Sequence, residues 1–295
     1  MDILSPPRMK RAWQIGIVKD EPWSHDLFRG IVGELIATTL FLYVCITTVV
    51  FMRIDNISEV NNGATGSTER LLIAFNFGLA IFVLVYLFAD VSGANINPAV
   101  SWGLCLGKRI TLKRCGLYII AQCLGAIIGV GLACSMSKAH FWETNGGANV
   151  VNNQVGAHQA LGGEILCTWL LVTVVLCATN PGLQKAYVHQ AVLLPWVIGM
   201  TVMLCHFTLV PVDGCSINPA RSFGSAIITN TWKDHWVFWL GPLIGATIAT
   251  LLFEAILRPP EPAPKLEAED PQAKLYETSN QNSSSRHGAY DETRV

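Results

Sequence analysis

The sequence SGANINPAVS at residues 92–101 occurs a second time, in altered form, as DGCSINPARS at residues 213–222. The shared core is Ile-Asn-Pro-Ala-x-Ser. One Asn-Pro-Ala triplet alone indicates only a turn that leads into a helix, because Asn caps helices well and Pro suits the first helical position. Two copies in one chain instead suggest an internal repeat, and similar sequence around them supports this.

Two further landmarks repeat at matching places. Gly-Glu at residues 33–34 pairs with Gly-Glu at 163–164, and Leu-Gly-Ala at 124–126 pairs with Ile-Gly-Ala at 244–246. The duplicated unit is therefore much longer than the motif. We expect two repeats, at about residues 28–136 and 160–258.

The composition indicates a membrane protein. Hydrophobic residues make up 51% of the 295 residues, charged residues only 14%, and the mean hydropathy is +0.41. A bilayer-crossing helix needs about 20 mostly apolar residues. Stretches that qualify are residues 31–52, 71–89, 115–136, 160–178, 188–210 and 236–257.

Each repeat contains three of these spans, so the second repeat must enter the membrane from the opposite face. After each triplet, residues 99–106 and 220–229 are too short to span and are expected to dip halfway into the bilayer. The predicted fold class is an all-α membrane protein with six transmembrane helices, two re-entrant half-helices and an inverted repeat.

The two triplets, Asn97-Pro98-Ala99 and Asn218-Pro219-Ala220, are expected to meet near the bilayer midplane. Irregular backbone at that depth is tolerated only beside protein or a watery cavity, so the loops should line a pore. Two positive helix ends would face one point, where the Asn97 and Asn218 amides donate hydrogen bonds. A water molecule there turns its hydrogens outward, which breaks a proton relay, and the positive field repels cations.

Basic residues indicate the orientation. They precede the first span or lie between spans 2 and 3, between 4 and 5, or after 6: Arg8, Lys10, Arg11, Lys19, Arg29, Lys108, Arg109, Lys113, Arg114, Lys185 and Arg258. By the positive-inside rule these regions and both termini face the cytoplasm.

The two ends of the chain differ from the apolar middle. Residues 1–27 are polar and form the predicted cytoplasmic N-terminal segment, while residues 28–258 form the channel domain. Residues 259–295 are rich in Pro, Glu, Ser, Asn and Gln, and they are expected to be a disordered cytoplasmic tail. Asn56 begins a glycosylation sequon in a loop expected to face outward.

The paired motifs, their places after spans 2 and 5, and Glu34 and Glu164 resemble the aquaporin (major intrinsic protein) family. Residues 82–86, 121–126 and 238–242 resemble its water-selective branch, including the plasma-membrane aquaporins of plants. The resemblance implies a homotetramer in the plasma membrane that passes water and needs no cofactor. It also implies that Glu34 and Glu164 support the pore loops.

By motif match, the family's narrow filter corresponds to Phe77, His206, Cys215 and Arg221. Phe77 alone also suits a core or lipid-facing aromatic, and His206 a core histidine. An arginine inside the membrane, in contrast, is costly enough to imply a functional cavity. In narrow polar surroundings, Cys215 is a target for a mercurial that would plug the pore.

The filter residues favour water over glycerol. Relatives that pass glycerol typically replace the histidine by glycine and carry Asp after the arginine, whereas this chain has His206 and Ser222. Hydrogen peroxide, similar to water in size and polarity, is expected as a minor solute. Asn95, Ser216 and Asp213 depart from the water-selective pattern, which usually has His and Gly at the first two positions.

Three weaker signals concern regulation and partners. Thr111 follows Lys108-Arg109 as in a basophilic kinase site, and His189 falls where plant plasma-membrane aquaporins have a gating histidine. Both residues also suit plain roles, Thr111 as a helix cap and His189 as a helix-start residue. The ending Thr293-Arg294-Val295 has the pattern that a PDZ domain binds as an added strand.

Other functional classes find little support. The nine cysteines lack metal-ligand spacing, and neither a Ser/His/Asp arrangement nor a phosphate-binding Gly loop is present, so we expect no enzyme, metal or cofactor. A net charge of −1 argues against nucleic-acid binding. Two alternatives remain: a glycerol or small-solute facilitator, and a junctional protein with a closed pore.

Overall fold

The computed structural model describes residues 16–59, 66–180 and 188–258, and for 53–59, 66–67 and 188–192 it describes the backbone alone. The described part is helical, and its one β-bridge joins Gly16 to Gly107. The predicted all-α class is therefore confirmed.

Six long helices provide the membrane spans that the sequence predicts. Each contains a segment long and apolar enough to cross a bilayer, so the chain is an integral membrane protein. The helices are α1 (His25–Glu59), α2 (Gly66–Ser92), α4 (Leu112–Met136), α6 (Ala157–Ala178), α8 (Val188–Asp213) and α10 (Val237–Leu252), which continues as a π-helical turn, η3 (Phe253–Leu257).

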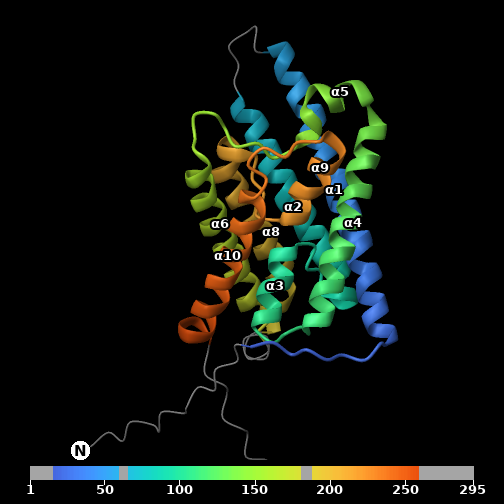
Figure 1. Cartoon of the computed structure of the whole chain (residues 1–295), viewed down its shortest axis with the longest axis vertical. Coiled ribbons are helices and arrows are strands. Elements are labelled where there is room, and N and C mark those ends of the chain that lie inside the picture. Colours follow the sequence, from blue (N-terminus) through green and yellow to red (C-terminus); the bar gives the residue numbers. More distant parts are fainter. Residues whose placement is uncertain (1–15, 60–65, 181–187, 259–295) are drawn as a thin grey trace, which may run out of the picture. The chain divides into compact units, whose positions relative to one another are not determined.

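Two short helices follow the Asn-Pro-Ala motifs. They are α3 (Pro98–Leu106) and α9 (Pro219–Thr229), with 9 and 11 residues. Each has Asn as its N-cap and Pro in its first turn, as expected for a helix that must start abruptly. Figure 1 shows α3 and α9 in opposite halves of the bundle, each between longer helices.

The packing of the helices follows the sequence repeat. In the first repeat α1 packs against α4, and in the second α6 packs against α10. The half-helices cross over, since α9 packs on α4 and α3 packs on α10. Helices α2 and α8 pack on each other and join the two repeats. Each half-helix is thus held partly by the other repeat.

Small residues allow the closest crossings. A Cβ atom at Gly125 of α4 would lie 2.5 Å from the carbonyl oxygen of Leu35 in α1. Gly245, its partner in the repeat, faces the Ile165 carbonyl of α6 in the same way. Backbones that approach this closely gain packing in a bilayer, where hydrophobic burial drives helix association only weakly.

The structure departs from the sequence prediction between the spans. Residues 53–59, where a loop with Asn56 is predicted, are instead the end of α1. Residues 137–159, between two predicted spans, contain α5 (Lys138–Glu143) and a 3₁₀ turn, η2 (Asn145–Gly147). Before α1, the chain runs along the connection between α3 and α4, where Gly16 N donates to Leu106 O at 3.1 Å and Leu112 N to Val18 O at 2.7 Å. A polar segment can lie there because backbone partners satisfy it.

Candidate channel and filter

The two loops before the half-helices have the same unusual backbone. Gly93, Ala94 and Ile96 have φ of 89°, 48° and 56°, and the matching Gly214, Cys215 and Ile217 have 82°, 55° and 45°. The left-handed region is costly for residues with a side chain, especially a β-branched one such as Ile. Surrounding contacts must therefore hold both loops in this form.

Two buried glutamates supply such contacts. Glu34 of α1 accepts hydrogen bonds from the backbone N of Asn95 at 2.9 Å and of Ile96 at 2.7 Å. Glu164 of α6 accepts from the backbone N of Ser216 at 2.7 Å and of Ile217 at 2.6 Å. Each glutamate thus holds the loop of its own repeat, at equivalent positions.

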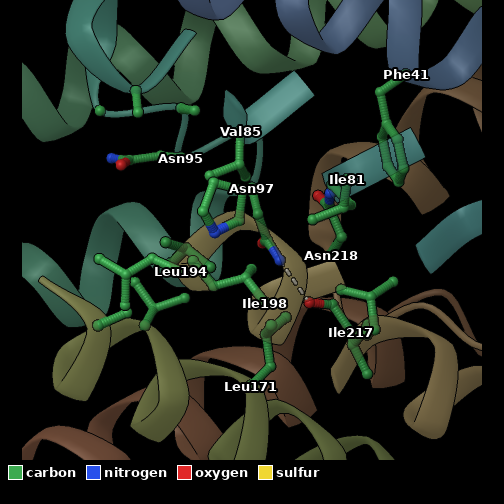
Figure 2. Close-up of a pocket in the computed structure, with 18 of the residues that line it drawn as sticks. Phe41, Ile81, Val85, Asn95, Asn97, Leu171, Leu194, Ile198, Ile217 and Asn218 are labelled. Atoms are coloured by element: carbon green, nitrogen blue, oxygen red, sulfur yellow. Dashed lines mark hydrogen bonds between the residues drawn. The ribbon is translucent and has the colours of Figure 1, made fainter. Parts of the chain in front are cut away.

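The motif asparagines join the two repeats. Asn97 Oδ1 accepts from Ala99 N at 2.8 Å, and this cap aims its Nδ2 at Ile217 O, 2.7 Å away (Figure 2). In the same way Asn218 Oδ1 accepts from Ala220 N at 3.1 Å, and its Nδ2 donates to Ile96 O at 2.9 Å. Since each amide carries two protons, one remains to face the cavity.

A central chamber of about 380 Å³ lies between the helices. On α2 its wall is a stripe at helical spacing, from Phe77 through Ile81 and Val85 to Ala89, and on α8 a second stripe runs from His206 through Val202 and Ile198 to Leu194. Figure 2 shows Asn97 beside these apolar walls. The chamber thus runs from a filter mouth at Phe77 and His206 to a second mouth at Asp90.

The filter mouth brings three of the four predicted filter residues together. The rings of Phe77 and His206 lie 4.2 Å apart between centroids, and the Arg221 guanidinium lies 5.5 Å from the Phe77 ring. Nδ1 of His206 is 2.8 Å from Val202 O, and since a carbonyl only accepts, this nitrogen carries the proton. Nε2 then stays an acceptor, with no partner among the described residues.

Cys215 and Arg221 lie in the adjoining loop and half-helix. The Cys215 backbone N donates to Asp213 Oδ1 at 2.9 Å, and the residue is fully buried. Neither Cys215 nor Arg221 is among the residues that line the chamber. Arg221 donates from Nη1 to Gly147 O at 2.8 Å. Its charge is therefore held in place beside the filter by the backbone of the α5–α6 connection.

Comparison with known proteins agrees with this geometry. The chain matches the major intrinsic protein family over residues 21–253. It belongs to the major intrinsic protein family. Because the members of this family are channels, the protein is a channel and not an enzyme.

Several relatives have plant sources. The chain is 42% identical to Aquaporin PIP2-1 of Arabidopsis thaliana over 239 residues, which are 80% of this chain and 83% of the relative. It is 44% identical to Probable aquaporin PIP2-2 of Oryza sativa subsp. japonica over 241 residues, with the same shares covered. The solved X-ray structure of the aquaglyceroporin from Plasmodium falciparum is 22% identical, with a TM-score of 0.67 over 79% of this chain and 98% of that one. That structure supports the major intrinsic protein fold.

Three residues of the site were not predicted from the sequence. Gln122 of α4 donates from Nε2 to Glu34 Oε2 at 2.8 Å, and Gly147 and Asn149 of the α5–α6 connection accept from Arg221 and Ser222 of α9. A polar residue inside an apolar span is a signal that could have revealed Gln122. Nothing in the local sequence points from residues 147–149 to Arg221, more than 70 residues away.

Thr111 lies outside the channel. It caps α4 by accepting from Arg114 N at 3.0 Å, and its hydroxyl donates to Glu21 Oε2 at 2.6 Å. Glu21 also pairs with the Arg114 guanidinium, which lowers the pKa of the Glu21 carboxyl below its ordinary value. Lys113 lies over the Trp23 ring, 4.0 Å from the centroid.

The other predicted sites stay untested. Asn56 and His189 lie within α1 and α8 by the bounds of these helices, but their side chains are outside the described residues. Thr293 and Val295 also lie outside the described residues. Between residues 16 and 258, apart from the undescribed gaps, no group of three or more His, Cys, Asp or Glu side chains could hold a metal ion.

Proposed function

We propose that this protein is a water-selective channel that lets water flow passively down osmotic gradients and excludes protons and ions. The observation that carries the proposal is the junction of a narrow polar filter with an apolar chamber. Phe77, His206 and Arg221 form the filter, and the chamber leads from it past both motif asparagines. The aquaporin names of the relatives support the same function.

The filter chemistry fits a single small polar solute. A water molecule there can donate to the free Nε2 of His206 and accept from the Arg221 guanidinium. The Phe77 and His206 rings lie 4.2 Å apart between centroids and are tilted by 33° to each other, so two bulky rings share the filter and we expect them to leave no room for a three-carbon polyol. Glycerol therefore meets a barrier, while hydrogen peroxide is small enough to follow water as a minor solute.

Charge is excluded at two points. The positive N-terminal ends of α3 and α9 face each other at Asn97 and Asn218, whose caps and crossed hydrogen bonds fix the direction of their remaining N–H groups. A water there accepts twice and cannot pass a proton along the file. Arg221 repels cations before they lose more of their hydration shell.

Stopped-flow shrinkage of proteoliposomes tests the proposal. Under a sucrose gradient the protein is expected to accelerate water efflux, whereas glycerol uptake should match that of empty liposomes. Val85→Trp should abolish water flow by filling the chamber, while Leu87→Trp, two residues further on the exposed face of α2, should not. Absence of acceleration by the wild type would refute the channel function, and fast glycerol uptake would identify a glycerol facilitator.

The filter itself has a separate test. His206→Gly removes the ring that packs on Phe77, so glycerol uptake is expected to rise while water flow persists. His206→Phe keeps a ring and serves as the control that should stay closed to glycerol. Glycerol exclusion that survives His206→Gly would show that the filter lies elsewhere.

Orientation and assembly are part of the proposal. Lys108, Arg109 and Arg114 lie around the α3–α4 connection, and Arg109 donates to Thr179, which lines the chamber together with Asp90. We therefore assign the Asp90 mouth and both termini to the cytoplasm. The names of the relatives support a plasma-membrane location. The homotetramer is proposed on the family resemblance alone. Protease protection of epitope-tagged termini in sealed cells tests the orientation, and cross-linking in membranes tests the tetramer.

The sites of modification and regulation are proposed on sequence patterns. They are glycosylation at Asn56, phosphorylation at Thr111, acid gating through His189 and a PDZ partner at Thr293 and Val295. Residues 259–295 are proposed to be a tail that the channel does not need. Truncation after Arg258 should then leave water flow per channel unchanged and abolish binding to a PDZ domain.

A further inference from the structure

Each pore loop is tied to its own half-helix by a side-chain hydrogen bond. In the first repeat, Asn95 Nδ2 donates to Ser101 Oγ at 3.1 Å, and in the second, the hydroxyls of Ser216 and Ser222 lie 2.6 Å apart. Both links join residues six positions apart in the chain. Asn95 and Ser216 are two of the positions at which this sequence departs from the water-selective pattern, so the departures build equivalent contacts.

The two links end on different supports. Ser101 Oγ also accepts from Gln122 Nε2 at 2.9 Å, so the first link is anchored to the transmembrane helix α4. By the repeat alignment Pro242 stands at the place of Gln122 in the second repeat, and it has no side-chain donor. There Ser222 Oγ donates instead to Asn149 Oδ1 at 2.7 Å. The second link thus depends on the α5–α6 connection.

The direction of the second link follows from proton counting. The single proton of Ser222 goes to Asn149, which leaves the Ser216 proton for the contact between the two hydroxyls. Asn218 O, 3.1 Å from Ser216 Oγ, is a second acceptor for that proton, so Ser216 also links the loop to the motif asparagine. Asn149 in turn donates from Nδ2 to Asp213 O at 3.0 Å, at the start of the same pore loop. Asn149, Ser216 and Ser222, here called the second-repeat clasp, are only 4%, 1% and 1% exposed. Ser216 lines the chamber, whereas Asn149 and Ser222 are not among its lining residues, so the bond between these two is the one that bulk water does not replace.

The clasp is adjacent to the filter. Arg221 directly precedes Ser222, and its guanidinium bonds to Gly147, two residues before Asn149. The segment of residues 147–149 therefore contacts this part of α9 twice. Asn149 binds Ser222, the next residue after Arg221, and Gly147 binds the Arg221 guanidinium. A shift of this segment must move Arg221 relative to Phe77 and His206.

We propose that Asn149 and Ser216 are positioning residues for solute selectivity, acting through Ser222 to fix Arg221 at the filter. The inference rests on the proposed water-channel function and names a part of the selectivity mechanism outside the filter ring. Asn95, Ser101 and Gln122, the first-repeat clasp, hold the other loop on the far side of the chamber and do not contact Arg221. They provide a matched control within the same chain.

The test compares the ratio of glycerol to water permeability across variants in proteoliposomes. Asn149→Ala removes two hydrogen bonds, to Ser222 and to Asp213, and is expected to raise this ratio by about fivefold or more, since one ordinary hydrogen bond corresponds to about fivefold. Ser216→Ala should raise it too, and the double variant should add little to Asn149→Ala, because both act through Ser222. Ser222→Thr keeps the hydroxyl and should keep the wild-type ratio. Asn95→Ala should change water flow without changing the ratio.

Two results would overturn the proposal. One is an unchanged ratio in both Asn149→Ala and Ser216→Ala when each protein inserts and elutes as wild type does. The other is a ratio of glycerol to water permeability that rises as much in Asn95→Ala as in Asn149→Ala. Such a rise would reflect general loosening of the helix bundle. If the wild type passes no water, the proposed function fails by itself. Thermal denaturation then tests whether the second-repeat clasp exists. If it does, the losses of stability in Asn149→Ala and Ser216→Ala are not additive in the double variant.

Discussion

Asp213 is a carboxylate that the fold buries at the end of α8. The residue is 1% exposed, and Oδ1 accepts from Cys215 N, while Oδ2 has no hydrogen-bond partner among the described residues. A buried carboxylate with an unsatisfied oxygen destabilises a protein unless it is neutralised. Asp213 therefore supports the turn of the second pore loop at a cost to stability.

Asp213→Asn is expected to raise the melting temperature of the purified protein in detergent. The amide oxygen keeps the bond to Cys215 N, and a neutral side chain is easier to bury by about 1–3 kcal/mol. Asp213→Ala is the control, since it removes the acceptor as well and should lower the melting temperature. A lower melting temperature for Asp213→Asn would mean that the charge itself is paired within the fold.

Single residues show what a sequence can and cannot reveal about this site. Asn97, Asn218, Glu34 and Glu164 are visible because each pair recurs at matching places in the repeat. Asn149 has no such signal, because its role arises from a contact with Ser222 that is 73 positions away. Local patterns report helix periodicity and caps, whereas long-range pairing in irregular segments depends on the assembled fold.

At the scale of elements, the crossings of the helices depend on glycine. Gly125 of α4 faces the backbone of α1, whereas Gly131 on the same helix has no atom within 4 Å of an added Cβ. The length and apolar character of the spans are predictable from the sequence, since they follow from bilayer thickness. The sequence does not predict which glycine lies at a helix crossing, because Gly125 and Gly131 have similar apolar neighbours in the sequence.

Gly125→Ala is expected to destabilise the protein by about 1–3 kcal/mol, the usual effect of overpacking. Its new Cβ would come within 2.5 Å of Leu35 O, so α1 and α4 must separate. Gly131→Ala should be neutral or stabilising, because alanine favours helix and has open space there. Thermal denaturation of both variants in one detergent makes the comparison. Equal effects would show that the α1–α4 crossing is not tightly packed.

The segment before α1 is held by an ion pair whose strength depends on pH. The hydrogen bond from Arg114 lowers the pKa of Glu21 below its ordinary value of 4.5, so the ionised form is the one that the fold favours. The contribution of Glu21 to stability is therefore present above the pKa of the unfolded chain and is lost as the pH falls through the lower pKa of the folded one.

Glu21→Gln should accordingly lower the melting temperature at neutral pH. This difference from wild type should shrink once the pH falls below the pKa of the unfolded chain and vanish below the lower pKa of the folded one. The effect is expected to be small, because the pair lies partly in solvent. Asp20→Asn, one position earlier, is the matched control. A difference between wild type and Glu21→Gln that persists unchanged into acid would show that Glu21 acts through packing rather than charge.

At the scale of the whole molecule, the two repeats are linked at their centre. Asn97 donates to Ile217, and Asn218 donates to Ile96, so each motif completes the loop of the other repeat. The inverted repeat is predictable from the motif copies, but this exchange of partners is not. A sequence repeat states that two units are alike and leaves open which atoms of one unit satisfy the other.

Asn97→Ala and Asn218→Ala are expected to have similar effects despite their distance in the chain. Each removes a helix cap, worth about 1 kcal/mol, and one bond between the repeats. Both variants should lose water flow per channel and melt at a lower temperature than wild type. Ser225→Ala, a buried change in α9 away from the exchange, is the control. A large loss of water flow or of melting temperature in only one of the two asparagine variants would argue against the equivalence of the two repeats.

The exchanged bonds also have a consequence for how the protein is made. The acceptor of the Asn97 amide is 120 residues further along the chain, and a ribosome needs on the order of ten seconds to synthesise that length. During this interval the first repeat can enter the membrane and form the bonds of its loop to Glu34, but it cannot form the two bonds between the repeats. The Asn97 amide therefore stays without its acceptor until Ile217 has been made, and the centre of the channel should form only after the second repeat is in the membrane.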